Sequence, residues 1–390
     1  MSSPRRLAAL TATTTAVLGL ALLSPTPASA DPLPPPDRHA LESAIAGLPD
    51  NAVTSAQVRV SGGAGRWTGR AGVRDVRTGR PVPDDARFRT GSATKMFTAS
   101  LVLQLAAEGR LTLDQSVQSL LPGLLPATYP TITVGQLLDH TSGLPSSTED
   151  AGHEDPAWVV RHRFDWHSPR EVVRSAVAQP MVFAPGTRQQ YNGVNYFLAG
   201  LVVEQVTGRS YAHELRNRLL RPLGLADTYL PERGDVRLRG PHSHGYVRVQ
   251  GRLVDVTSQS AYAWAEGGLV SSTRDLDRFL RLLMAGRVVP QPWLDLMLTV
   301  PDVPYEGTSG GCAQGPDAGH ACFTTGLQRT ALPGGPVVYG KSGGTPGYRT
   351  LTVATEDGAR VLTLSLTTTG NGDGSEDPRL MGVAAAAFGL

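Results

Sequence analysis

The spacing of hydrophobic residues divides the chain into three parts with different expected structure. Residues 56–76 alternate apolar and polar positions and are interrupted by glycines, as in a β-hairpin. From Ser92 to Leu111 the apolar residues recur at helical spacing, and further helical patterns continue to about residue 300. From Phe323 the chain returns to strand-like segments rich in Val, Thr, Leu and Tyr, and it ends in an apolar helical pattern.

Strand patterns at both ends and helical patterns between them predict an α/β (α+β) fold. The economical arrangement is one antiparallel sheet built from both ends of the chain, flanked by helices, with an inserted and mostly helical region. We expect the sheet to come from residues 31–115 and 300–390, and the helical region from residues 116–299. Together they would form one domain, residues 31–390, which is long enough to bury a large core.

Residues 1–30 have the pattern of a secretory signal peptide. Arg5 and Arg6 precede a short apolar run, and Ala28–Ala30 offers a small-residue cleavage site. The apolar run is short for a membrane span of roughly 20 residues. We therefore expect cleavage near Ala30 and a secreted, extracellular protein without stable membrane insertion.

Composition narrows the possible partners. The chain is 40% hydrophobic and 18% charged with a net charge of +2, which is typical of a soluble globular protein. Its arginines are interleaved with acidic residues and form no basic stripe, so nucleic acid is not an expected partner.

The two cysteines, Cys312 and Cys322, lie ten residues apart in a Gly-rich loop. In an oxidising compartment this spacing favours a local disulfide. A metal site with His320 as a third ligand is the alternative, but the loop lacks a Cys-x-x-Cys pair.

Lysine is rare in this chain, and its two positions indicate candidate catalytic residues. Among 36 Lys and Arg residues, only Lys95 and Lys341 are lysines. Ser92 and Lys95 are three positions apart at the start of a predicted helix, so their side chains share one face. A serine hydroxyl needs a base, and burial can lower the pKa of a lysine far enough for it to serve as one. Arginine cannot deprotonate at working pH, which explains why Lys95 is kept.

Two further groups strengthen this hypothesis. Lys341 lies on a predicted strand, where it and Ser342 would face a substrate bound as an additional strand. Tyr191 lies on a loop before a predicted helix. The charges of two lysines would lower the pKa of this phenol, which could then carry protons.

The three motifs together resemble those of the penicillin-recognising serine hydrolases. The resemblance is to the branch that holds class C β-lactamases, secreted D-alanyl-D-alanine carboxypeptidases and related esterases, and it covers roughly residues 80–365. The motifs are, in order, Ser92-Ala-Thr-Lys95, Tyr191-Asn-Gly193 and Lys341-Ser-Gly343. The resemblance implies a β-lactamase-like fold.

The resemblance also implies roles for the motif residues. Ser92 would be acylated, Lys95 and Tyr191 would move protons, and Lys341 would support Tyr191. The N–H groups of Ser92 and Gly344 would form the oxyanion hole. Ser342 would bind a substrate carboxylate beside Gly343. No cofactor would be required.

The middle motif departs from the family pattern, which ends in Asn where this chain has Gly193. The missing amide normally holds the acyl-side carbonyl and contacts the first-motif Lys. Either Asn192 swings round, or Asn195 substitutes, or the grip on the substrate is changed; Asn192 also fits a simple turn residue.

Three other side chains are considered for a role in or near the site. Glu266, where the family often has Ala, is either an additional acid in the site or a salt-bridged loop residue. Arg329 is a candidate for binding a substrate carboxylate, or a solvated surface residue. His140 is expected to structure a loop.

Two alternatives from other classes, an α/β-hydrolase and an inactive binding protein, fit the sequence less well. The Gly-x-Ser-x-Gly around Ser342 fits an α/β-hydrolase elbow, but no helix can start there and the last histidine, His320, precedes it. A catalytically inactive peptide-binding homologue is disfavoured because Ser92, both lysines and Tyr191 are all present. We expect a monomeric D-alanyl-D-alanine carboxypeptidase that acts on peptidoglycan peptides. A class C-like β-lactamase that takes β-lactams, and an esterase or D-amino-acid amidase, are the alternatives.

Overall fold

The computed structural model describes residues 33–149, 152–307, 312–313, 317–370 and 374–390. The predicted signal peptide, residues 1–30, lies outside the described residues, so its cleavage and the expected secretion stay predictions. In the part of the chain that is described, no helix is both long and apolar enough to cross a bilayer.

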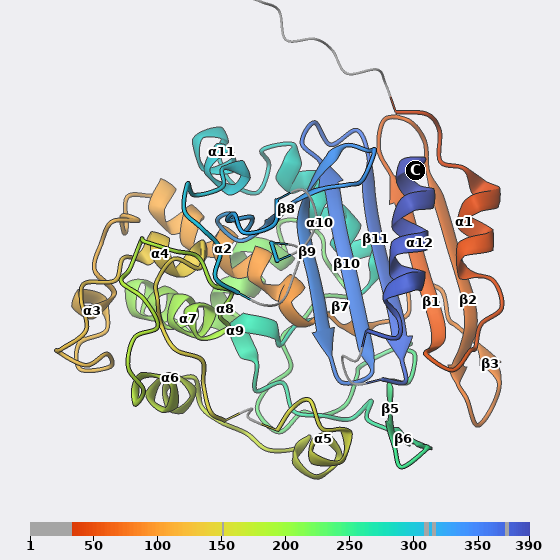
Figure 1. The fold of residues 1–390 in the computed structure, drawn as a ribbon, viewed down its shortest axis with the longest axis horizontal. Helices are drawn as coiled ribbons and strands as arrows, with labels where there is room; N and C mark the ends of the chain where they lie inside the picture. The colour runs from red at the N-terminus through yellow and green to blue at the C-terminus, as the bar shows by residue number, and fades with distance from the viewer. Residues whose placement is uncertain (1–32, 150–151, 308–311, 314–316, 371–373) are drawn as a thin grey trace, which may run out of the picture. The chain divides into compact units, whose positions relative to one another are not determined.

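A seven-stranded antiparallel sheet carries the fold (Figure 1). Its order is β3-β2-β1-β11-β10-β9-β8, so strands from the N-terminal end continue directly into strands from the C-terminal end. The two ends join where β1 pairs with β11 and Val58 lies opposite Leu364. The strands are β1 (Val53–Ser61), β2 (Trp67–Asp75), β3 (Arg80–Pro81), β8 (Gln328–Ala331), β9 (Val337–Thr345), β10 (Tyr348–Thr355) and β11 (Val361–Thr368). The predicted antiparallel sheet built from both ends is confirmed.

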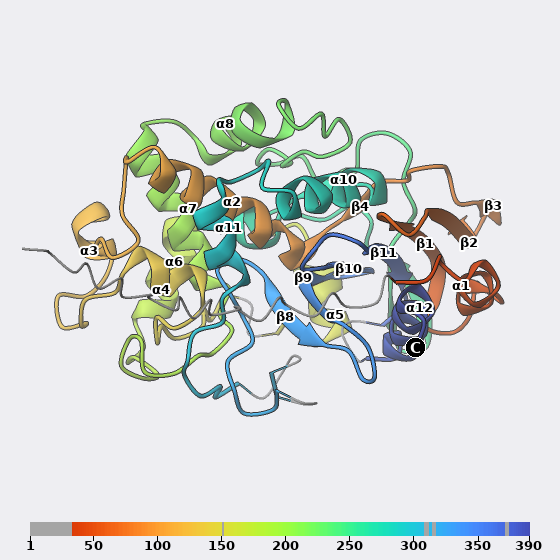
Figure 2. The same ribbon diagram turned by 90° about the horizontal axis from the view of Figure 1, so that it is seen from above.

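Helices cover both faces of this sheet. The terminal helices α1 (Arg38–Ile45) and α12 (Asp377–Phe388) share one face, where Leu41 and Phe388 are buried in a common core with Leu364. Figure 2 shows them on one side of the sheet and α10 (Thr273–Met284) on the other.

The larger core lies on the side of α10 and is built from α2, from the inserted helical region and from residues of the sheet. Its two long central helices, α2 (Thr94–Ala107) and α7 (Val194–Thr207), are buried on most sides, which explains their largely apolar sequences. The shorter helices are α3 (Val117–Leu120), α4 (Val134–Leu138), α5 (Pro156–His162), α6 (Pro169–Val177), α8 (Tyr211–Glu214), a π-helical turn at Leu215–Leu220, α9 (Trp264–Gly267) and α11 (Gln291–Leu298). The predicted helical insertion is confirmed.

A short strand pair brings residues 92 and 266 together, although they are 174 positions apart. β4 (Phe88–Arg89) pairs with β7 (Val270–Ser271), and the Thr90 N–H then donates to the Leu269 carbonyl at 2.9 Å. β5 (Tyr246–Val249) and β6 (Arg252–Asp255) form a separate hairpin.

Candidate active site

Ser92 and Lys95 face each other at the start of α2. Ser92 lies in a 3₁₀ turn, Gly91–Ala93, and Lys95 lies in the first turn of the helix that follows. The Lys95 Nζ is 3.0 Å from the Ser92 Oγ. Lys95 is only 1% exposed, whereas Ser92 is half-buried. The structure thus brings together the two side chains that their spacing placed on one face.

A carboxylate, Glu266, joins this pair. Its Oε1 forms an ion pair and a hydrogen bond with the Lys95 Nζ, and the same oxygen lies 3.4 Å from the Ser92 Oγ. The backbone oxygen of Glu266 accepts a further hydrogen bond from Lys95 at 3.1 Å. The sequence left open whether Glu266 is an additional acid in the site or a salt-bridged residue. Both descriptions apply, because its salt-bridge partner is the lysine beside the candidate nucleophile.

The pKa of Lys95 is not lowered, which corrects the expectation from sequence. Burial alone would lower the pKa of this ammonium, but the charge of the Glu266 carboxylate, with Tyr191, outweighs burial and raises it above its usual value. Lys95 is therefore charged near neutral pH and acts as a hydrogen-bond donor to Ser92. The direction of this pKa does not favour Lys95 as the base.

Tyr191 lies between the two lysines. The Nζ atoms of Lys95 and Lys341 are 5.0 and 4.6 Å from the centre of its ring. Among the described residues its buried hydroxyl has no hydrogen-bond partner of good geometry. Burial by itself would raise the pKa of the phenol, but the charges of Lys341 and Lys95 exceed that effect and hold the pKa of Tyr191 below its usual value. This is the predicted direction, and it makes the phenolate accessible as a base.

Lys341 lies on β9 and is 5% exposed. Burial lowers the pKa of this ammonium, and the neighbouring charge of Lys95 lowers it further, against the opposing effect of Tyr191. Its Nζ also donates to the Ser342 carbonyl at 3.4 Å.

The outer part of β9 offers an open edge. β8 pairs with β9 only as far as Gly340, and among the described residues no strand continues that pairing past Lys341 and Ser342. An extended substrate can therefore add to this edge, as the sequence suggested.

Glycines allow β9 to approach the turn that carries the nucleophile. A Cβ on Gly343 would lie 2.0 Å from the Thr90 carbonyl oxygen and 3.0 Å from the Ser92 nitrogen. A Cβ on Gly91 would lie 2.7 Å from the Gly344 nitrogen. The N–H groups of Ser92 and Gly344, the expected oxyanion hole, thus belong to two backbones in close contact.

The two asparagines considered as replacements for the missing amide are engaged elsewhere. The Asn192 amide donates to the Leu144 carbonyl at 2.7 Å and accepts from the Val194 N–H at 2.9 Å. The Asn195 amide oxygen accepts from the Ser142 hydroxyl at 2.6 Å. The structure therefore gives no support to substrate binding by Asn192, which instead caps the start of α7.

His140 holds the loop behind Tyr191. The N–H of Asn192 and the amide nitrogen of Asn195 each lie 3.2 Å from its Nδ1, so the ring proton belongs on Nε2. Burial, followed by the charges of the two lysines, keeps the pKa of His140 well below its usual value. The ring is neutral and lies 4.5 Å from the Tyr191 ring, consistent with the predicted structural role.

Gly193 leaves the space that Glu266 fills. A Cβ on Gly193 would lie 3.0 Å from the Glu266 Cγ, 3.1 Å from its Oε1 and 3.3 Å from its Cδ. The φ of Gly193 is −64°, which any residue adopts, so the backbone does not require glycine here. A side chain at position 193 would compete with the Glu266 carboxylate for the same space.

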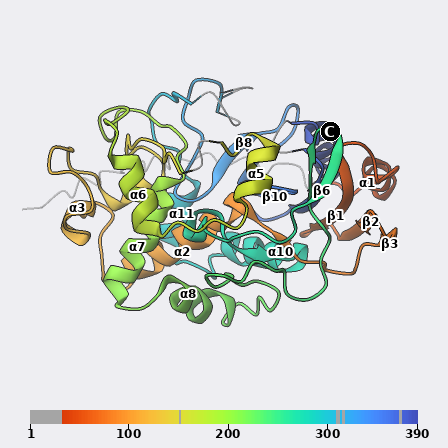
Figure 3. The same ribbon diagram turned by 90° about the horizontal axis from the view of Figure 1, so that it is seen from below.

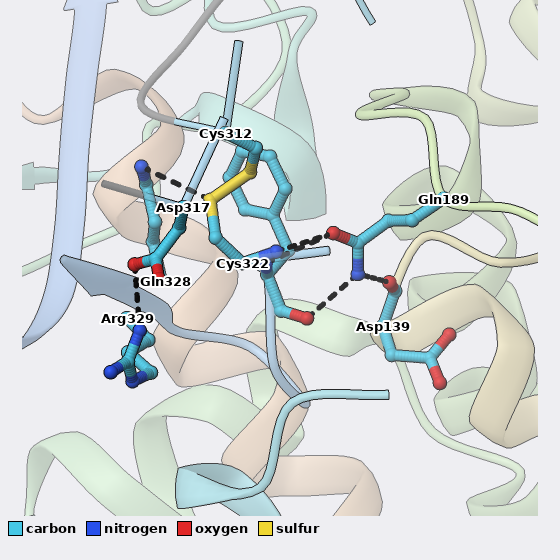
Figure 4. The surroundings of a disulfide bond; sticks show 8 residues. Asp139, Gln189, Cys312, Asp317, Cys322, Gln328 and Arg329 are labelled. Atoms are coloured by element: carbon cyan, nitrogen blue, oxygen red, sulfur yellow. Dashed lines mark hydrogen bonds and ion pairs between the residues drawn. A yellow bond between two sulfur atoms is a disulfide. The ribbon is translucent and has the colours of Figure 1, made fainter. Parts of the chain in front are cut away.

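Arg329 is ion-paired beside the disulfide loop. Its Nη1 donates to the Asp317 carboxylate at 2.6 Å, as Figure 4 shows. Its charge is balanced and it does not line the cavity beside Ser92, so the expected carboxylate-binding role loses its support. Cys312 and Cys322 form the predicted disulfide, which excludes a metal as the reason for these cysteines.

Gln189 ties the disulfide loop to the segment that carries Tyr191 (Figure 4). Its Oε1 accepts from the backbone N–H groups of Cys322 and Phe323 at 3.0 and 3.1 Å. Its Nε2 donates to the carbonyl oxygens of Asp139 and Phe323, each at 2.7 Å. Because the Phe323 ring packs 4.8 Å from the Tyr191 ring, this network sets the position of the phenol.

A cavity of about 290 Å³ opens beside Ser92. Its walls come from α5, from the segment before α9, and from the turn between β9 and β10; Figure 3 shows α5 near β10. Trp158 and Tyr262 contribute aromatic rings to the lining, and Glu266 contributes a carboxylate. The cavity therefore suits an apolar or aromatic group next to a polar one.

Comparison with known proteins agrees with this geometry. Residues 41–386 match the family model Beta-lactamase. Penicillin-binding protein 4 of Amycolatopsis lactamdurans is 34% identical over 229 residues, which span 56% of this chain and 56% of that protein, little more than half its length. The solved structure of a D-stereospecific amidohydrolase from Streptomyces sp. has a TM-score of 0.78 at 33% identity and covers 90% of this chain and 99% of that one.

The D-amino acid amidase from Ochrobactrum anthropi SV3, at 22% identity and a TM-score of 0.72 over 89% of this chain and 97% of that one, shares the fold. The β-lactamase-like fold and the resemblance inferred from the three motifs are confirmed. The chain belongs to the Beta-lactamase family and is a serine hydrolase of that family.

Proposed function

We propose that this hydrolase cleaves amides and esters of D-amino acids through an acyl-enzyme on Ser92. The observation that carries the proposal is the contact of Glu266 with both Lys95 and Ser92 beside an aromatic cavity. A carboxylate at this point favours a substrate with a positive charge next to the scissile carbonyl. The similarity to a D-stereospecific amidohydrolase along 99% of that chain supports the substrate class.

Acylation follows from the charges of the site. The Ser92 Oγ attacks the carbonyl carbon, and its proton passes to the Tyr191 phenolate. The charged Lys95 stabilises the serine oxygen, and the N–H groups of Ser92 and Gly344 stabilise the oxyanion. The carbon–nitrogen bond then breaks, and the proton goes to the leaving nitrogen.

Deacylation reverses these roles. A water molecule loses a proton to Tyr191 and attacks the ester carbonyl. The carbon–oxygen bond to Ser92 breaks, and the serine oxygen recovers the proton. The products from an amide are a D-amino acid and ammonia or an amine; from an ester, the carbon–oxygen bond breaks in acylation and the proton goes to the leaving alcohol.

A D-alanyl-D-alanine carboxypeptidase, which the sequence alone favoured, is the second candidate. The open edge of β9 and the similarity to penicillin-binding protein 4 of Amycolatopsis lactamdurans favour it. Such an enzyme needs a cation for the terminal carboxylate of its peptide. Arg329, the candidate for that task, does not line the cavity beside Ser92, whereas Glu266 does, and we therefore place the amidase first.

The test compares ammonia release from D- and L-phenylalaninamide with D-alanine release from an acyl-D-Ala-D-Ala peptide. Ser92→Ala is the control in each assay. We expect turnover of the D-amide that depends on Ser92 and exceeds cleavage of the peptide. Cleavage of the peptide alone would favour the carboxypeptidase, and no turnover above the control would contradict both functions.

A further inference from the structure

We infer that Glu266 selects substrates with a free α-amino group, by binding the α-ammonium where the family places an amide. The inference rests on the proposed function and narrows its substrate class. It excludes N-acylated compounds, such as acyl peptides and penicillins, as good substrates.

The Glu266 side chain occupies the space next to Gly193. A Cβ on Gly193 would lie 3.0 to 3.3 Å from three side-chain atoms of Glu266, so an Asn at position 193 would crowd the Glu266 side chain out of its present position. The amide of that Asn would contact the first-motif lysine, and here Glu266 makes this contact with Lys95. Gly193 and Glu266 therefore form one exchange, in which a carboxylate replaces an amide in the same part of the site.

A carboxylate and an amide differ in the hydrogen bonds that they can form with a substrate. An amide offers two N–H donors to a carbonyl oxygen, whereas a carboxylate offers only acceptors. The carbonyl oxygen of an N-acyl substrate would meet the Glu266 carboxylate without a donor. An ammonium in that place would instead gain a charge-assisted hydrogen bond.

The Glu266 carboxylate is accessible from the cavity beside Ser92. Glu266 lines the cavity, its side chain is 19% exposed, and its Oε1 is 3.4 Å from the Ser92 Oγ. A substrate whose carbonyl carbon reaches the Ser92 Oγ therefore lies close enough for its α-amino group to reach this carboxylate. The cavity wall also holds Glu149, Asp165 and Glu376, which pair with His167, His162 and Arg349 as Glu266 pairs with Lys95. In the described part of the chain, only the Glu266 carboxylate forms a hydrogen bond with the Ser92 hydroxyl.

The test measures kcat/KM for D-phenylalaninamide and for N-acetyl-D-phenylalaninamide, and follows the ratio of the two values. Glu266→Gln keeps the size of the side chain and removes its charge. We expect the ratio to fall by roughly 10- to 100-fold, the scale of one hydrogen bond to a charged group, mainly through KM of the free amine. A general loss of catalytic power affects both substrates and cancels in the ratio.

Two further variants sharpen the result. Glu149→Gln removes a different carboxylate of the same cavity and should change the ratio much less. The double variant Gly193→Asn with Glu266→Ala restores the amide and should prefer the N-acetyl substrate. An unchanged ratio in Glu266→Gln, or an equal fall in Glu149→Gln, overturns the inference.

Binding separates this inference from the proposed function. Calorimetry with the Ser92→Ala variant measures the affinity of both compounds without turnover. Tighter binding of the free amine, lost when Glu266→Gln is added, supports the inference even if the wild type turns neither compound over. Equal binding of both compounds contradicts it even if D-amides are cleaved.

Discussion

The Glu266 side chain packs directly against Gly193. A Cβ added at Gly193 would lie only 3.0 Å from the Glu266 Cγ. Gly193 precedes α7 and Glu266 lies on α9, two helices that pack together. The carboxylate also holds Lys95, so a change at position 193 is transmitted to the lysine beside the nucleophile.

Gly193→Ala should therefore reduce activity without unfolding the protein. Displacing Glu266 weakens its contact with Lys95, and we expect kcat/KM for a D-amide to fall about 10-fold or more, equivalent to ~1.4 kcal/mol. The cost of crowding, roughly 1–3 kcal/mol, is partly offset by the better helix propensity of alanine. Steady-state kinetics and thermal melting measure both effects. Gly382→Ala, on α12 with open space around its Cβ, is the matched control, and full activity in Gly193→Ala would refute the coupling.

Lys341→Met should move the acidic limb of the pH–rate profile to higher pH. In the proposed mechanism the phenolate of Tyr191 is the active form, and the charge of Lys341 is the largest of the effects that lower the pKa of this phenol. Without that charge the pKa of Tyr191 rises, so a higher pH is needed for the same activity. Lys341→Arg keeps the charge and should keep the limb near its wild-type position. An unshifted limb in Lys341→Met would show that Tyr191 is not the base.

His140→Asn should flatten the dependence of stability on pH below neutrality. The pKa of His140 is well below its usual value in the folded protein and about 6.5 in the unfolded chain. Below that pH the unfolded state binds a proton that the folded state does not, so stability falls as pH falls, by up to ~1.4 kcal/mol per pH unit.

Asn keeps a carbonyl acceptor and tolerates the φ of +63° at this position, but it does not titrate. Urea unfolding at pH 5 and pH 7 gives the slope for each protein. Equal slopes for the wild type and His140→Asn would mean that another group carries the pH dependence.

Gln189→Met should destabilise the protein and lower its activity together. The buried amide of Gln189 serves four hydrogen bonds to backbone groups of three residues, and each group left unpaired costs about 1–3 kcal/mol. The same bonds position Phe323 against Tyr191, so kcat should fall as well. Urea unfolding and kinetics are the measurements. The exposed Gln205→Met is the control, and a Gln189→Met protein as stable as this control would contradict the account.

The sequence predicted the parts of the site that rest on local spacing. Ser92 and Lys95 are neighbours on a helix because of their three-residue separation, and Tyr191 and Lys341 follow from motifs read along the chain. The sheet was also predictable, because strand patterns at both ends leave few other ways to bury their apolar faces.

The expectations that the structure does not support concern residues whose contacts come from distant segments of the chain. The pKa of Lys95 has the opposite direction to the prediction because Glu266, 171 positions away, supplies a charge that no local pattern reveals. Arg329 is neutralised by Asp317, a partner across the disulfide loop. The one available signal for the Glu266 contact was the pair of departures from the family pattern, Gly193 and Glu266, and nothing in a single sequence links two such positions.

Intact-mass analysis of the protein after mixing with a D-phenylalanine ester tests the central claim most directly. The account predicts a mass increase equal to one D-phenylalanyl group less the displaced hydrogen. Peptide mapping should assign the increase to Ser92, and Ser92→Ala should show none. An adduct on Ser342, or turnover of the ester by the Ser92→Ala variant at the wild-type rate, would contradict it.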